Sequence, residues 1–312
     1  MFDSKPHSDP QTTIVHISPA ERERERSLRE RFAQFWGTAT GEIRDVYDRF
    51  VAEVPLTEDV SLEPVNDDRV RGWWVRPPHA EASRAILYLH GGAYVLGSAQ
   101  AYRGFVSQIV SRTRVPALVL DYPLAPEAPL PAAPLAAQEA YTLLTQQGFE
   151  RVALVGDSAG GGLALVTLAE LVKQRRGAMP IAGVVFSPWT DLALTGASLT
   201  DPSVVDPLLS YELLQDSSRK YVNGHEPTNP LASPLYADLR RLPPLLIQVG
   251  TDERLLDDSR QFTERARRAG VSAELEIWEG MHHVFQRDVE HLESSRNALD
   301  RAARFLRKTL KS

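Results

Sequence analysis

From about residue 60 onward, short apolar runs alternate with segments of helical periodicity, and this rhythm constrains the fold of the 312-residue chain more than any other feature. The apolar runs predict strands near residues 70–75, 85–89, 115–120, 152–155, 183–186, 245–249 and 273–278. Helical patterns lie between them, at about residues 101–112, 132–147, 159–175, 257–269 and 291–310. This alternation predicts an α/β fold in which a mostly parallel sheet has helices on both faces.

Two parts of the chain depart from the alternation. The N-terminal part begins a helix at a capping box, Ser18 to Glu21, and a second short helix is expected near residues 42–51. The charges from Glu21 to Arg26 alternate in sign, so we expect that run to be solvated. Residues 191–242 are too many for a simple crossover and hold one good helix, near 211–221. We interpret this interval as an insertion above the sheet, of the kind that forms lids.

Composition excludes several kinds of chemistry. The chain has no cysteine, which rules out disulfides, thiolate metal sites and a cysteine nucleophile. Lys and Arg number 35 against 41 Asp and Glu, a net charge of −6 that argues against a nucleic-acid partner. Residues 1–10 are polar and lack a signal peptide's apolar core, and no stretch has the ~18 apolar residues of a membrane span. We therefore expect a cytoplasmic protein without a membrane span.

A serine lies where a strand meets a helix. Gly156-Asp157-Ser158-Ala159-Gly160 matches G-x-S-x-G, between the predicted strand at 152–155 and the helix at 159–175. A sharp strand-to-helix turn needs small flanking residues, and it exposes the serine at the positive end of the helix. Ser158 is therefore a candidate nucleophile, to be activated by a base and an acid that follow it in the order acid, then histidine.

The C-terminal third supplies candidates for both partners. Asp252 follows the strand at 245–249, and the residues Glu253, Asp257 and Asp258 compete with it for the role of the acid. His282 and His283 follow the strand at 273–278, and spacing alone does not choose between them. Asp252 and the histidines lie just past strand ends, where open α/β sheets place their sites, whereas Asp257 and Asp258 are expected to cap and begin the next helix.

A glycine turn follows the strand at 85–89 and reads His90-Gly91-Gly92-Ala93. Glycines let backbone N–H groups approach a ligand oxygen, so we expect the amides of Gly91 and Gly92, with that of Ala159, to form an oxyanion hole. His90 is expected to serve as a structural hydrogen-bonding residue of this loop.

These motifs resemble those of the bacterial hormone-sensitive-lipase-like carboxylesterases, also called family IV esterases. The similarity runs from about residue 60 to 310, and five ordered motifs carry it: His90-Gly91-Gly92-Ala93, Asp121-Tyr122-Pro123-Leu124-Ala125-Pro126-Glu127, Gly156-Asp157-Ser158-Ala159-Gly160, Ser187-Pro188-Trp189-Thr190-Asp191-Leu192 and Gly280-Met281-His282-His283-Val284-Phe285. The family's usual third glycine of the oxyanion loop is Ala93 here.

The resemblance implies the α/β-hydrolase fold, with an eight-stranded, mostly parallel sheet and a helical cap in a single domain spanning residues 1–312. It assigns the acid to Asp252 and the base to His283, placing the cap at about 1–50 and 192–225 and the body at about 55–191 and 226–312. No cofactor or metal is implied.

The predicted activity is that of a serine carboxylesterase acting on short- to medium-chain esters through an acyl-enzyme. Alternatives are a lactone hydrolase similar to the monoterpene ε-lactone enzymes, an amide hydrolase with the same triad, and a non-catalytic receptor of this fold. The side chains of Tyr94, Trp189, Phe32 and Trp36 are candidates for the substrate pocket. The last strand should be a sheet edge, which would permit a homodimer.

Overall fold

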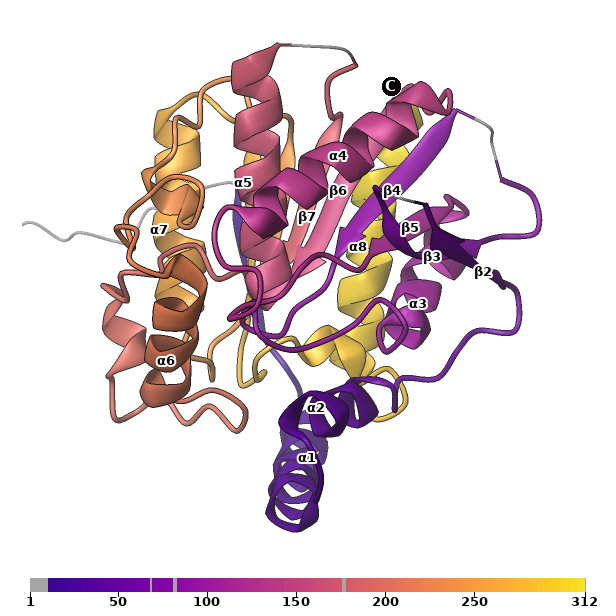
Figure 1. Ribbon diagram of the computed structural model, residues 1–312. Coiled ribbons are helices and arrows are strands. Elements are labelled where there is room, and N and C mark those ends of the chain that lie inside the picture. The colour runs from indigo at the N-terminus through magenta and orange to yellow at the C-terminus, as the bar shows by residue number, and fades with distance from the viewer. Residues whose placement is uncertain (1–10, 68, 81–82, 176–177, 312) are drawn as a thin grey trace, which may run out of the picture.

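The computed structural model describes residues 11–67, 69–80, 83–175 and 178–311 (Figure 1). Its strands are β1 (Thr12–Val15), β2 (Ser61–Asn66), β3 (Arg71–Arg76), β4 (Arg84–Leu89), β5 (Ala117–Leu120), β6 (Arg151–Asp157), β7 (Ala182–Phe186), β8 (Leu245–Gly250) and β9 (Ala273–Trp278). Its α-helices are α1 (Pro19–Thr38), α2 (Ile43–Val51), α3 (Arg103–Thr113), α4 (Ala132–Gln146), α5 (Ser158–Gln174), α6 (Tyr211–Val222), α7 (Leu256–Arg268) and α8 (Glu293–Lys311). The predicted strands and helices are therefore present, with bounds shifted by a few residues at most.

All the described strands belong to one sheet, in the order β1-β9-β8-β7-β6-β4-β5-β3-β2. Along this order, neighbouring strands pair in parallel from β1 through β9, β8, β7, β6 and β4 to β5. Strand β3 pairs antiparallel with both β5 and β2. The mostly parallel α/β-hydrolase sheet is confirmed, but it holds nine strands among the described residues instead of eight. The strands β1 and β2 were not among those predicted from the apolar runs.

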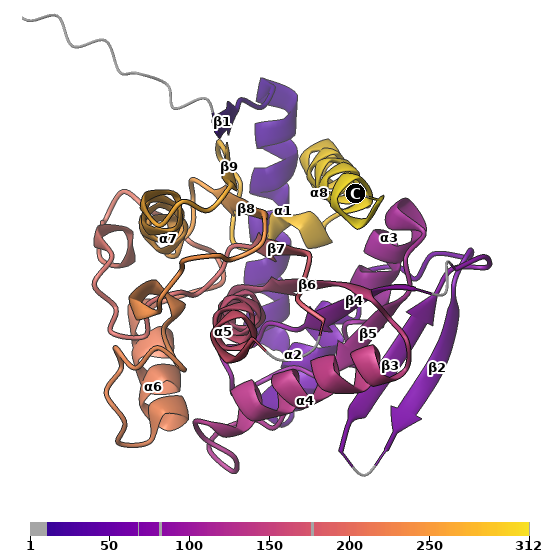
Figure 2. The same ribbon diagram turned by 90° about the horizontal axis from the view of Figure 1, so that it is seen from above.

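Helices cover both faces of the sheet, as the alternation of strands and helices predicts. Helices α3 and α8 pack on one face, and α4, α5 and α7 pack on the other (Figure 2). Successive strand residues point to opposite faces. In β4, Ile86 and Tyr88 enter one core while Leu87 and Leu89 enter the other. This is why the parallel strands read as continuous apolar runs.

The last strand is not a sheet edge. Strand β1 runs parallel to β9, with Thr12 opposite Leu275 and Val15 opposite Trp278. The expectation of a free edge at β9 is therefore wrong, because β1, about 260 residues earlier in the chain, pairs with the backbone of β9. The outer edge of the sheet at this end is β1.

Helices α1, α2 and α6 lie at the end of the sheet where α5 begins (Figure 1). The N-cap of α1 is confirmed, because Glu21 N–H donates to Ser18 Oγ at 3.1 Å. The expected solvation of residues 21–26 is wrong in part, since Glu21 and Glu25 are buried. Glu21 accepts from Ser294 N–H at 2.7 Å, which fixes α1 to the start of α8.

No helix in the described part of the chain is long and apolar enough to cross a membrane. Residues 1–10, on which the expectation about a signal peptide depends, lie outside the described residues.

Candidate active site

Ser158 lies on a sharp turn between β6 and α5. Its φ of 53° falls in the left-handed region, which a residue other than glycine adopts at a cost of about 1–3 kcal/mol. The turn is possible because glycines lie two residues before and two residues after Ser158: a Cβ on Gly160 would lie 2.1 Å from the carbonyl oxygen of Leu89. Ser158 is thereby held at the carboxyl end of the sheet, at the first residue of α5.

His283 faces this serine. Its Nε2 lies 2.9 Å from Ser158 Oγ, and the imidazole is almost fully buried. The loop that holds it follows β9, and the next residue, Val284, has a φ of 52°. The prediction of His283 over His282 as the partner of Ser158 therefore agrees with the geometry.

The carboxylate beside His283 belongs to Glu253. Its Oε2 lies 2.8 Å from His283 Nδ1, so the N–H at Nδ1 donates to it and Nε2 is left to accept the serine proton. Its Oε1 accepts from Ser187 Oγ at 2.8 Å and from Gly250 N–H at 2.7 Å. Glu253 is completely buried, and these two donors fix its orientation. The serine of the Ser-Pro-Trp motif thus supports the acid.

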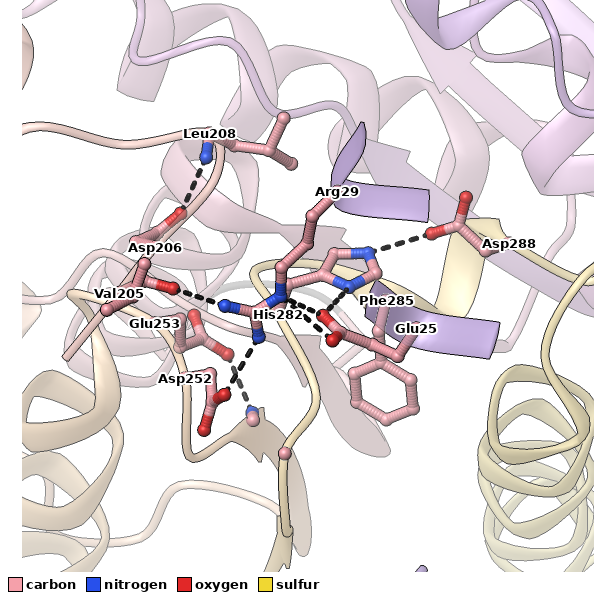
Figure 3. A network of polar contacts seen from close by, with 12 residues as sticks. Glu25, Arg29, Val205, Asp206, Leu208, Asp252, Glu253, His282, Phe285 and Asp288 are labelled. Atoms are coloured by element: carbon pink, nitrogen blue, oxygen red, sulfur yellow. Dashed lines mark hydrogen bonds and ion pairs between the residues drawn. The ribbon is translucent and has the colours of Figure 1, made fainter. Parts of the chain in front are cut away.

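Asp252, the expected acid, points the other way. Its Oδ2 accepts from Arg29 Nη2 at 2.8 Å (Figure 3). Its Oδ1 accepts from Thr251 Oγ1 at 2.9 Å. The two adjacent carboxylates therefore have different partners, and the one in contact with His283 is that of Glu253. Asp252 was predicted to be the acid beside His283, but the structure places Glu253 in that position. The signal was present in the sequence, because Glu253 was among the candidates.

The Asp252–Arg29 pair belongs to a larger network that ties α1 to the site. Arg29 also donates to Glu25, through Nε at 2.7 Å, and to the carbonyl of Val205 in the insertion, at 2.7 Å (Figure 3). One guanidinium therefore connects the N-terminal helix, the insertion and the loop that holds Glu253.

His282 is buried in the same network. Its Nδ1 lies 3.0 Å from Glu25 Oε1 and its Nε2 lies 2.9 Å from Asp288 Oδ2. Burial by itself lowers the pKa of His282, but the hydrogen bonds to Asp288 and Glu25 outweigh it and raise the pKa to about 9. His282 therefore anchors α1 as an imidazolium, one residue from the candidate base.

The oxyanion loop differs from the prediction at one residue. The amide of Gly91 donates to Asp157 Oδ1 at 3.0 Å, so it is not free to bind a substrate oxygen. Within the part of the chain that the structure describes, the amides of Gly92 and Ala93 have no hydrogen-bond partner. Ala93 also has a φ of 53°, and with Gly92 it lines the pocket above Ser158.

Ala93 therefore replaces Gly91 as the expected donor. The amide of Ala159 lies in the first turn of α5, where helix amides lack intrahelical partners. His90 is structural as expected, stacked on Tyr122 at a ring-centroid distance of 4.3 Å, and burial lowers its pKa.

A cavity of about 330 Å³ opens over Ser158 and His283. Of the four predicted pocket residues, only Trp36 lines it. Phe32 packs edge-on against His282, at 5.1 Å between centroids, and lines a separate outer pocket. Tyr94 and Trp189 are buried beneath the site, Tyr94 stacked on Tyr221 at 3.8 Å. The cavity is lined mainly by apolar side chains of α1, α2 and the insertion, which sequence periodicity did not distinguish from core residues.

No group of three or more acidic or histidine side chains among the described residues is arranged to hold a metal ion.

Comparisons with known proteins identify the family of the chain. A family model described as alpha/beta hydrolase fold matches residues 86–287. An acetyl-hydrolase of Streptomyces hygroscopicus is 39% identical over 285 residues, which is 90% of this chain and 95% of that protein. An esterase of Acinetobacter venetianus is 38% identical over 80% of this chain and 82% of its own.

Solved structures are similar over nearly the whole chain. An esterase from the bacterial hormone-sensitive lipase family superposes with a TM-score of 0.87, at 39% identity, over 94% of this chain and 99% of that one. A hormone-sensitive lipase from a metagenome library gives a TM-score of 0.85, at 32% identity, over 91% and 98% of the two chains.

Fold and site together define an α/β-hydrolase whose serine, histidine and carboxylate are aligned at the end of the central strands. The chain belongs to the bacterial hormone-sensitive lipase family, the family IV esterases, and is a carboxylic ester hydrolase. The resemblance carried by the five sequence motifs is confirmed.

Proposed function

We propose that the chain hydrolyses short- to medium-chain carboxylic esters through an acyl-enzyme formed on Ser158. The observation that supports this most is the continuous chain of contacts from Ser158 Oγ to His283 at 2.9 Å and from His283 to Glu253 at 2.8 Å. Serine is a weak nucleophile at neutral pH, and a base oriented by a third group is what activates it.

In the acylation step, His283 Nε2 takes the proton of Ser158 as its oxygen attacks the ester carbonyl. The amides of Gly92, Ala93 and Ala159 stabilise the negative charge on the carbonyl oxygen, and each such donor is worth about 3 kcal/mol. Protonated His283 then gives its proton to the departing alcohol. Glu253 holds the imidazole in the required tautomer and stabilises its positive charge.

In the deacylation step, water attacks the acyl-enzyme from the position that the alcohol has left. His283 takes a proton from this water, and the same amides stabilise the second oxyanion. Collapse of the tetrahedral intermediate returns the proton to Ser158 Oγ and releases the carboxylic acid. The chemistry in this scheme needs only side chains and amides of the chain itself.

The cap proposed from the sequence, residues 1–50 and 192–225 over a body of 55–191 and 226–312, is supported by what surrounds the cavity. Trp36 and Tyr47 line it from the N-terminal helices, and Leu208 and Leu213 line it from the insertion. A cavity of about 330 Å³ is at the lower end of small-molecule sites, which favours a short acyl chain.

The test is hydrolysis of p-nitrophenyl esters from acetate to palmitate by the wild type and by Ser158→Ala. We expect highest activity at short chain lengths, and a loss of at least about a thousandfold in the variant. Retained activity in Ser158→Ala would reject the nucleophile, and a maximum at long chains would reject the substrate class. The same protein assayed with ε-lactones and with p-nitroanilides separates the lactone and amide alternatives, and no turnover of any substrate would favour the receptor.

The homodimer and the cytoplasmic location also remain proposals. Because β1 covers β9, a dimer through the sheet edge would use the outer side of β1. Light scattering that gives the mass of one chain would reject the dimer, and cell fractionation tests the location.

A further inference from the structure

Arg287 lines the cavity above Ser158 and is the one basic side chain among the described residues in the cavity wall apart from His283. It lies at the end of the turn that follows His283, in the short helix Phe285–Arg287. Only 9% of the residue is exposed. The arginine is therefore fixed close to the catalytic loop, in a wall that is otherwise mostly apolar.

The carboxylates of Asp288 and Asp157 lie near enough to favour the positive charge of Arg287, but neither forms an ion pair with its guanidinium. Among the described residues it has no side-chain hydrogen bond and no ion pair, and its buried Nε has no partner. The guanidinium lies over the ring of Phe50, with Cζ 5.2 Å from the centroid. A ring face accepts no hydrogen bond of ordinary strength, so this contact leaves the N–H donors of the guanidinium without partners.

The carboxylates near Arg287 are engaged elsewhere. Asp157, in the same cavity wall, accepts from Tyr88 Oη at 2.7 Å, from Tyr102 Oη at 3.0 Å and from Gly91 N–H. Asp288 bonds His282.

Phe50 and Arg287 also line an outer pocket, together with the acidic side chains Glu53, Asp288 and Glu290. None of these acids forms an ion pair with Arg287 in the described part of the chain. The guanidinium thus keeps donors for a group that enters the cavity.

We propose that Arg287 is a specificity-determining residue that binds a free carboxylate on the substrate, so that the preferred esters are monoesters of dicarboxylic acids or hydroxy acids acylated on their hydroxyl group. This inference rests on the proposed esterase function and names its substrate class. A guanidinium offers a planar fork of N–H donors that matches a carboxylate in two parallel hydrogen bonds. The apolar wall around it strengthens that interaction by excluding water.

The experiment compares esters that differ only in charge. Monoethyl glutarate is paired with its amide, ethyl 4-carbamoylbutyrate, and 3-acetoxypropionate is paired with 3-acetoxypropionamide. The readout is the ratio of kcat/KM for the acid to that for the amide, from a pH-stat at pH 7.5. We expect a ratio above one for at least one pair in the wild type. In Arg287→Met we expect that ratio to fall about tenfold or more, because hydrogen bonds to charged groups are the strong ones.

The matched control is Arg31→Met, which removes an exposed arginine that lines the outer pocket but not the cavity over Ser158. We expect it to keep the wild-type ratio, and Arg287→Lys to keep part of it. If Arg287→Met does not fold, competitive inhibition of the wild type by glutarate, compared with glutaramide, gives the same information.

A wild-type ratio of one or less for both pairs, or an equal fall for acid and amide in Arg287→Met, would overturn the inference. Turnover of p-nitrophenyl butyrate by the wild type keeps that failure distinct from a failure of the proposed function. No turnover of any ester would instead reject the esterase proposal itself.

Discussion

The stability of the protein should fall as His282 loses its proton. Both ring nitrogens of His282 face carboxylate oxygens, at 3.0 Å for Glu25 and 2.9 Å for Asp288. A neutral imidazole has one N–H, so its second nitrogen would meet a carboxylate without a proton between them. The imidazolium satisfies both, and its pKa is raised to about 9 from an ordinary value of 6.5.

The pH dependence of the free energy of unfolding follows from the difference between the folded-state and unfolded-state pKa of His282. Because the folded-state pKa lies above the unfolded one, the stabilisation is fully present below pH 6.5 and is lost as the pH rises through about 9. The interval between those values corresponds to about 3 kcal/mol. The free energy of unfolding of a typical protein is roughly 5–15 kcal/mol, so this contribution is a large part of it.

The assay is urea unfolding at pH 6, 7, 8 and 9.5, for the wild type and for His282→Gln. We expect the free energy of unfolding of the wild type to fall by about 3 kcal/mol more than that of the variant between pH 6 and 9.5. The exposed His225 provides the control, and His225→Gln should follow the wild type. Parallel curves for His282→Gln and the wild type would refute the reasoning.

Two further predictions concern α1 and the serine turn. Arg29→Met should lower the free energy of unfolding by about 2 kcal/mol, because buried Glu25 loses one of its two cationic partners and Asp252 loses the same cation, whereas Arg26→Met, in an exposed pair, should change it by less than about 0.5 kcal/mol. A chemical denaturation series of both variants checks this, and equal effects would contradict the buried role. Gly160→Ala should give inactive or insoluble protein, since its Cβ has only 2.1 Å to a backbone oxygen. Gly37→Ala, which meets no atom within 4 Å, should raise the melting temperature slightly through helix propensity, and a stable, active Gly160→Ala would refute the packing argument.

The fold was predictable because its signals are local. Strands buried on both faces read as apolar runs, and α5 begins where the glycines around Ser158 permit a sharp turn. Ser158, His283 and the oxyanion loop follow the ends of separate strands, and a parallel sheet brings such ends together. Sequence order was therefore enough to predict most of the candidate site.

The choice between Asp252 and Glu253 was not predictable in this way. Both follow β8, and which one faces His283 depends on the direction of the turn, fixed here by Gly250 N–H and Ser187 Oγ on Glu253. A carboxylate's neighbours in space, not its position in the chain, decide its role.

The burial of Glu21 and Glu25 in α1 was also not predictable, because it depends on contacts with residues far away in the sequence. Besides Arg29, Glu25 bonds His282, which is 257 residues away, and the sequence of α1 alone gives no sign of that contact. Strand β1 was missed for a related reason, because four residues carry little pattern and its pairing partner, β9, is 260 residues later.

We propose that Ser158, His283 and Glu253 act as one catalytic unit. The role of Glu253 is the part of this proposal that can be tested most directly. The most direct measurement is kcat for p-nitrophenyl butyrate in Glu253→Gln and in Asp252→Asn, two neighbouring variants that each remove one negative charge. We predict a loss of about 10³–10⁴ in Glu253→Gln, because an amide favours the wrong tautomer of His283, and less than about tenfold in Asp252→Asn. A large loss in Asp252→Asn with near-normal turnover in Glu253→Gln would contradict the account.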